Sequence, residues 1–194
     1  MPRDPGAVGR VDVGDGIYVS VPGPEPSRRV PLPALVIGIG LAGVALVRLG
    51  VTADGVLAAW MLIVLAALAG VDLRARVLPN RIIGPAMIAA LVWQLAFSPE
   101  HVVECLLAAV GVGAFLFVTC LVSPGALGMG DIKLAALLGL ALGAQVVGAL
   151  TIGFIAAIPA AVAVLIAGGR DARRTAIPFG PFLGFGAAVV LLAS

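Results

Sequence analysis

The chain has 194 residues, of which 61% are hydrophobic and only 11% are charged, and its mean hydropathy is +1.18. One soluble core could not hide so much apolar surface, so the composition excludes an ordinary water-soluble domain and predicts a bilayer as the solvent. The net charge of +2 is too small, and the arginines too scattered, for a nucleic-acid-binding surface.

Residues 1–31 differ from the rest because they mix proline, glycine and charged residues without a helical period. We predict a flexible cytoplasmic tail over this segment. A secretory signal peptide is not expected, since the first apolar run begins only near Leu32 and is long enough to stay in the membrane. Residues 32–194 are then expected to form one transmembrane domain.

Apolar runs of about 17 to 25 residues, the length needed to cross a hydrocarbon core, recur along this domain. The predicted fold is all-α, a polytopic transmembrane bundle of six to seven helices. The expected helices are residues 32–50, 55–72, 82–97, 101–122, 131–145, 147–167 and 178–193. Residues 132–167 would rise about 54 Å as one helix, so a turn at 143–145 is expected to divide them. The last segment is short enough to be re-entrant, which leaves six spans as an alternative.

Basic residues indicate the orientation of the bundle, because they accumulate in loops that stay in the cytoplasm. Eleven of the twelve fall on one side of the predicted bundle, and Arg48 is the exception. This distribution predicts an inner (cytoplasmic) membrane protein with a cytoplasmic N-terminus. Two acids, Asp72 and Asp131, map to the same cytoplasmic side.

Each of these acids has a structural explanation as well as a chemical one. Asp72 ends the apolar run WMLIVLAALAGV and could form an interfacial ion pair with a following arginine. Asp131 begins the next helix and could cap it. Capping does not explain Gly128 and Gly130, which permit backbone conformations and close approaches that a side chain would block. An extended substrate backbone lying against Asp131 would explain them.

Two carboxylates at one depth, on separate helices, are typical of aspartic protease chemistry. One takes a proton from water while the other, kept protonated by their mutual repulsion, polarises the scissile carbonyl. Other chemistries have weaker support. Cys105, Cys120 and the single histidine, His101, lack zinc-site spacing, and no serine stands in a GxSxG context. Neither a metal nor an organic cofactor is expected.

Three pieces of sequence occur in a set order: DLRARVLPN (72–80), GMGDIKL (128–134) and IPFGPFLGFGA (177–187). Together they resemble the type 4 prepilin peptidases, which belong to the GxGD intramembrane aspartyl proteases. The resemblance covers roughly residues 55–194 and implies that Asp72 and Asp131 are the catalytic aspartates. Members of this family cut the short, positively charged leader from prepilins or pseudopilins at the cytoplasmic face, typically after a glycine.

The other matched residues are expected to shape the site. Pro79 and Asn80 would form the turn before the third helix, which Asn80 could cap. Lys133 could pair with a carboxylate or with the membrane surface. Pro178, Gly180 and Pro181 fit a helix entry packed near the site, or simply a helix start. The loop at 123–131, which includes Gly125, is expected to adjust as substrate binds.

Longer members of the family carry a cytoplasmic domain after the first helix, often with paired CxxC motifs, that is associated with N-methylation of the new terminus. Here only a few residues join the first two predicted helices, which implies a short form with peptidase activity alone. The expected partners are a prepilin or pseudopilin substrate and membrane lipid, and the oligomeric state stays open.

Two alternatives belong to other classes of protein. An ion-coupled transporter could use Asp72 and Asp131 as cation sites, since acids within membranes mark such sites. It should show internal symmetry and broken helices near the midplane, whereas both acids here are predicted at one rim. A membrane scaffold without enzymatic activity would tolerate replacement of either aspartate by asparagine.

Overall fold

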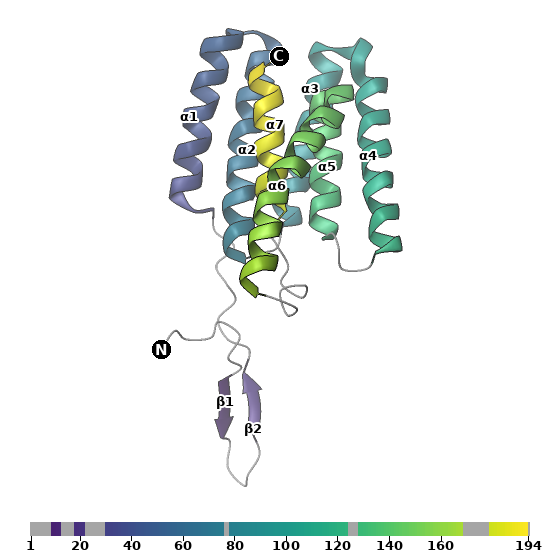
Figure 1. The fold of residues 1–194 in the computed structure, drawn as a ribbon. Helices are drawn as coiled ribbons and strands as arrows, with labels where there is room; N and C mark the ends of the chain where they lie inside the picture. Colours follow the sequence, from purple (N-terminus) through teal and green to yellow (C-terminus); the bar gives the residue numbers. More distant parts are fainter. Residues whose placement is uncertain are drawn as a thin grey trace.

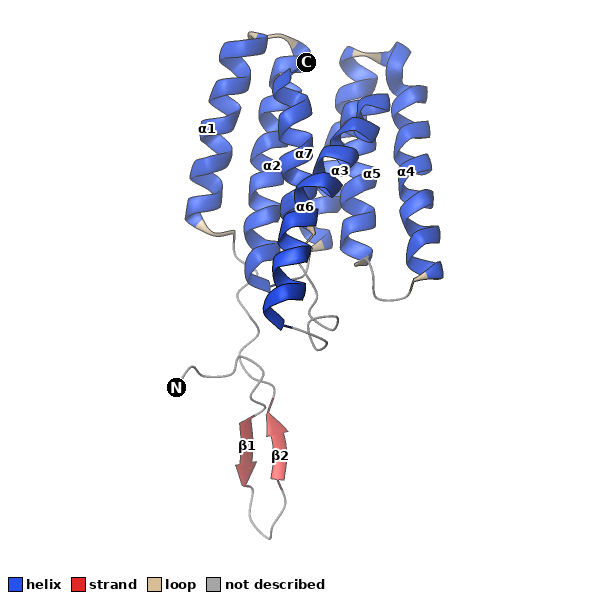
Figure 2. Cartoon of the chain, in the orientation of Figure 1, coloured by secondary structure: helices blue, strands red, loops and turns tan. Residues whose placement is uncertain are grey.

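The computed structural model describes residues 9–12, 18–21, 30–75, 78–123, 128–168 and 179–193. The described residues contain seven α-helices packed as a bundle, which confirms the predicted all-α polytopic fold (Figures 1 and 2). The helices are α1 (Leu32–Leu49), α2 (Ala53–Ala75), α3 (Asn80–Phe97), α4 (Val102–Val122), α5 (Met129–Leu142), α6 (Val146–Gly168) and α7 (Gly180–Ala193). Two 3₁₀ turns, η1 (Pro99–His101) and η2 (Gly143–Gln145), precede α4 and α6. Every helix begins and ends within a few residues of its predicted bounds.

The described part of the N-terminal tail forms a short hairpin. Strand β1 (Gly9–Asp12) pairs antiparallel with β2 (Tyr18–Val21), and Gly9 lies opposite Val21. Regular structure was not expected in this segment, because its prolines, glycines and charged residues follow no helical period. Valine and tyrosine favour extended backbone, which accounts for the pairing. The prediction of a flexible tail otherwise falls on residues outside the described ranges.

Helix α2 lies at the centre of the bundle. In the most apolar 18-residue stretch of α2, 61% of the residues are buried, compared with 17% in the corresponding stretches of α1 and of the η1–α4 segment. Its entry is fixed by Thr52, whose hydroxyl oxygen accepts the backbone N–H of Gly55 at 3.1 Å. Asp72 therefore sits in the last turn of the most enclosed of the candidate membrane spans. That end of the bundle is called the lower end here, as drawn in Figure 1.

The division between α5 and α6 is the predicted turn at residues 143–145. Gly143 has φ +55°, in the left-handed region that favours glycine. The last carbonyls of α5 lack helical partners there, and the buried side chain of Gln94 donates its amide to the carbonyl of Leu140 at 3.3 Å. A buried amide from α3 thus stabilises the break in an apolar stretch of 36 residues.

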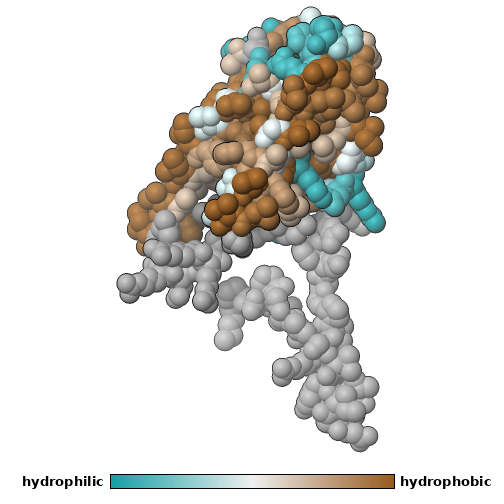
Figure 3. All heavy atoms as spheres, turned by 90° about the vertical axis from the view of Figure 1, so that its right-hand side faces the viewer, coloured by the Kyte–Doolittle hydropathy of each residue, from teal (hydrophilic) through white to brown (hydrophobic). Residues whose placement is uncertain are grey.

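The surface agrees with a protein that crosses a bilayer several times. Among the described residues, five segments are long and apolar enough to cross, namely α1, α2, α3, η1–α4 and the continuous stretch Met129–Val164, which contains α5 and most of α6. Figure 3 shows a broad hydrophobic belt, with hydrophilic residues gathered mainly above and below it. The chain is therefore a multi-pass membrane protein.

Helix α7 is shorter than these segments, with 14 residues. Its first residue, Gly180, contacts Asp72 at the lower end, whereas Leu191 lines a pocket at the upper end. Figure 1 accordingly draws the C-terminus at the upper end. Helix α7 reaches from one end of the bundle to the other. The structure therefore favours seven membrane-crossing helices, and a re-entrant last segment is disfavoured.

Candidate active site

A pocket of about 330 Å³ opens at the lower end, between the last turn of α2 and the first turns of α3 and α5. Its lining residues are Asp72, Leu78, Asn80, Gly128, Met129, Gly130, Asp131 and Lys133. Six of the seven predicted site residues are among them. The seventh, Pro79, is the N-cap of α3 next to the pocket and does not line it. Residues that are far apart in the sequence therefore meet in one concave site.

Asp72 is the enclosed carboxylate of the pair. Its side chain is 5% exposed, and one carboxylate oxygen, Oδ2, accepts the backbone N–H of Gly180 at 3.1 Å. That donor is the first residue of α7, 108 positions along the chain. A buried carboxylate needs such partners because burial without a hydrogen bond is costly. Asp72 is thus held by a tertiary contact, and not only by its own helix.

Asp131 is the more open carboxylate and lies in the first turn of α5, which begins two residues earlier than predicted. Its Oδ2 accepts the backbone N–H of Gly128, the N-cap residue, at 3.3 Å. Gly128 has no side chain to return the bond, so only one half of a capping box is formed. The capping role considered from the sequence is therefore real. It also directs the carboxylate to the mouth of the pocket.

The two glycines beside Asp131 are explained by close packing. A Cβ on Gly130 would lie 2.8 Å from the Cβ of Leu78, and one on Gly128 would lie 3.3 Å from the carboxylate of Asp131. Unusual backbone conformation is not the reason, since Gly128 has φ −80° and Gly130 is not among the described glycines with positive φ. Gly130 thus permits a close approach of Leu78, whereas the approach of a substrate backbone stays a prediction.

Asn80 and Lys133 bond to each other across the pocket. The Lys133 ammonium donates to Oδ1 of Asn80 at 2.9 Å, which links α5 to α3. The prediction that Asn80 caps α3 is wrong: Pro79 occupies the N-cap position with extended backbone, and no side-chain cap bond is made there. Proline fixes this extended start, so the helix begins at Asn80 and leaves its amide available to Lys133.

Three features of this site were not predicted from the sequence. Leu78 and Met129 line the pocket, and Gly180 donates to Asp72. Leucine and methionine carry no chemical signal in a chain this apolar. The glycine in the third matched piece did point to a helix entry near the site, but its partner could not be known. Gly125 and Pro178 lie outside the described residues.

A second, larger pocket of about 510 Å³ lies at the upper end and shares no lining residue with the first. Asp54, Gln94 and Glu104 are among its polar lining residues. Glu104 accepts the backbone N–H of Ala144 at 3.1 Å, which holds the start of α6. In the described part of the chain, no three histidine, cysteine or acidic side chains group as a metal site would require.

The fold and the lower pocket define a multi-pass membrane protein with two carboxylates, from separate helices, in one concave site. Residues 56–169, more than half of the chain, match the type IV leader peptidase family. The chain belongs to this family, and its activity is that of a peptidase. The matched segment includes both Asp72 and Asp131, whereas α1 and α7 lie outside it. Comparison with curated proteins and with solved structures finds no match.

Proposed function

We propose that this peptidase is an aspartyl endopeptidase that removes the short basic leader from type IV prepilin or pseudopilin-like substrates at the cytoplasmic membrane face. The observation that carries the proposal is the meeting of Asp72 and Asp131 in one pocket of a family peptidase. Among the described residues that line this pocket, Lys133 is the only other ionisable one, and it is bonded to Asn80. The two carboxylates are therefore the groups best suited to activate water.

In the proposed reaction, a water molecule lies between Asp72 and Asp131. One carboxylate accepts a proton from the water as its oxygen attacks the scissile carbonyl carbon, while the other, protonated, donates a hydrogen bond to the carbonyl oxygen. The carbon–nitrogen bond then breaks, and a proton passes to the departing amine. No covalent enzyme intermediate is formed, and the residues of the pocket supply every proton transfer.

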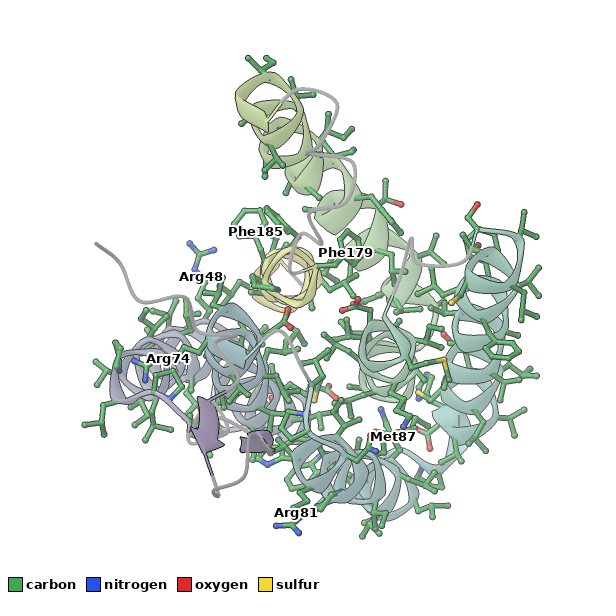
Figure 4. All side chains as sticks on the ribbon, turned by 90° about the horizontal axis from the view of Figure 1, so that it is seen from below. Arg48, Arg74, Arg81, Met87, Phe179 and Phe185 are labelled. Atoms are coloured by element: carbon green, nitrogen blue, oxygen red, sulfur yellow. The ribbon has the colours of Figure 1, made fainter. Side chains whose placement is uncertain are left out.

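Charge supports a cytoplasmic orientation for the lower end. Arg74, Arg81 and Lys133 lie there, and Figure 4 shows Arg81 projecting outward from the bundle. The upper end instead carries acidic residues, including Asp54 and Glu104. Because basic loops are retained in the cytoplasm, this asymmetry favours leader cleavage at the cytoplasmic face of the inner membrane. Family membership favours this reading over the ion-coupled transporter.

The test is co-expression with a candidate prepilin, with leader removal followed as a mobility shift. We expect processing by the wild type and a loss of at least 100-fold in Asp72→Asn and Asp131→Asn, since neither amide can transfer the proton. Asp54→Asn is the matched control, because this carboxylate lies in the upper pocket. Processing that survives both lower-pocket substitutions would end the aspartyl assignment.

A further inference from the structure

We infer that Gly180, at the start of α7, is a positioning residue that holds the Asp72 carboxylate in its working orientation. The inference rests on the proposed role of Asp72. It extends the active site to a helix outside the family-matched segment, which ends at residue 169, whereas α7 begins at residue 180.

The contact is specific to one atom of the carboxylate. The backbone N–H of Gly180 donates to Oδ2 of Asp72 at 3.1 Å, and both groups are buried. Asp72 lies in the last turn of α2, where the nearby helix carbonyls disfavour a negative charge. A donor at the first turn of a second helix offsets that effect. A fixed hydrogen bond also limits rotation of the carboxylate about its side-chain torsions.

The identity of residue 180 follows from the same contact. A Cβ there would lie 2.7 Å from Oδ2 of Asp72, closer than real Cβ atoms come to an oxygen. The atom in the way is the end of the Asp72 side chain itself. A methyl group at residue 180 would therefore turn the carboxylate aside and leave the backbone of both helices in place.

The rest of α7 makes this donor immobile. Leu183 and Ala187 are fully buried, and Gly186 packs against the backbone of Ala149 in α6 so closely that no Cβ would fit. In α6, Gly153 also lies close to α7, since a Cβ there would be 2.8 Å from the backbone oxygen of Phe182. Figure 4, viewed along the bundle, shows α7 end-on between α2 and α6. Helix α7 is therefore fixed from both sides.

Other parts of the molecule give weaker support for a further functional role. The upper pocket holds several polar side chains, but Glu104 bonds to Ala144 and Gln94 bonds to Leu140, so no buried group there awaits a ligand. The outer half of α6 exposes apolar side chains such as Ile158, which lipid would cover. The contact between Gly180 and Asp72, by contrast, joins a distant helix directly to one of the two proposed catalytic carboxylates.

The experiment compares Gly180→Ala with Gly184→Ala, one turn further along the same helix. A Cβ on Gly184 would meet Leu65 at 3.9 Å, an ordinary contact. For purified protein cleaving a prepilin, we expect Gly180→Ala to lower kcat at least tenfold, with KM and the thermal midpoint unchanged, and Gly184→Ala to match the wild type. A merely structural role for Gly180 would instead lower the thermal midpoint.

Gly180→Pro provides a second variant, since proline is tolerated in the first turn of a helix but has no N–H to donate. We expect it to lower kcat at least as much as Gly180→Ala. Wild-type kcat in both variants, with Asp72→Asn inactive, would overturn the role of Gly180 alone. Activity in Asp72→Asn itself would overturn this inference together with the proposed function.

Discussion

Gly130 and Leu78 form the tightest contact around Asp131, because a Cβ on Gly130 would lie 2.8 Å from the Cβ of Leu78. Leu78 is 8% exposed and has little room to move away. We expect Gly130→Ala to lower thermal stability by about 1–3 kcal/mol, as overpacking usually does, and to reduce prepilin cleavage.

The matched test is the double variant Gly130→Ala with Leu78→Ala, which makes room for the added methyl group. Recovery of cleavage toward the level of Leu78→Ala alone would support the packing explanation. Equal loss in the single and double variants would contradict it, and would mean that a substrate contacts Gly130 directly.

Lys133 and Asn80 share a single hydrogen bond, so the effects of substituting the two residues on cleavage should not be additive. We expect Lys133→Met and Asn80→Ala each to lower cleavage less than tenfold, and the double variant to lower it no further. The reason is that each single variant already removes the bond of 2.9 Å that links α5 to α3. Cleavage is measured by the same mobility shift. A 100-fold loss of cleavage in Lys133→Met alone would instead indicate that the ammonium group takes a direct part in the reaction.

Helices α4 and α5 pack through their backbones at Gly139. A Cβ on Gly139 would lie 2.5 Å from the Cα of Ala109, which is backbone and cannot turn aside. Gly139→Ala should therefore separate the two helices and lower stability by about 1–3 kcal/mol or more. Because Asp131 is in the first turn of α5, cleavage should fall as well.

Gly111 is the matched control for this interface, since a Cβ there would meet nothing within 4 Å. Gly111→Ala should leave the thermal midpoint in detergent unchanged or slightly raised, because alanine favours helix over glycine. If the two alanine variants melted at the same temperature, the close approach of α4 and α5 would not matter to stability.

At the scale of the whole molecule, the orientation in the membrane can be measured by cysteine labelling. In a chain with Cys105 and Cys120 replaced by alanine, Gln145→Cys should react with an impermeant maleimide in intact cells, because Gln145 is exposed at the upper end. Arg81→Cys, exposed at the lower end, should react only after permeabilisation. The opposite pattern would place the aspartates outside the cytoplasm.

Much of the architecture could be predicted from the sequence, because membrane helices follow from apolar run length and the α5–α6 break follows from the thickness of a bilayer. Asp72 and Asp131 could be singled out because the basic residues place both at one end of the bundle and because Gly128 and Gly130 accompany Asp131. The contacts that surround these two aspartates could not be predicted from the sequence. The bond from Gly180 to Asp72 and the contact of Leu78 with Gly130 depend on how distant helices cross, and α3 is capped by Pro79 because backbone, not side-chain chemistry, begins that helix.

Helices α5 and α7 have only 14 residues each and are the shortest α-helices of the described chain. Each rises about 21 Å, whereas a typical hydrocarbon core is about 30 Å thick. Because residues at both ends of α5 line pockets, the apolar layer between the two pockets is thinner along this helix than a typical hydrocarbon core. Water that fills the lower pocket would reach Asp131 directly and could supply the molecule consumed in the proposed hydrolysis.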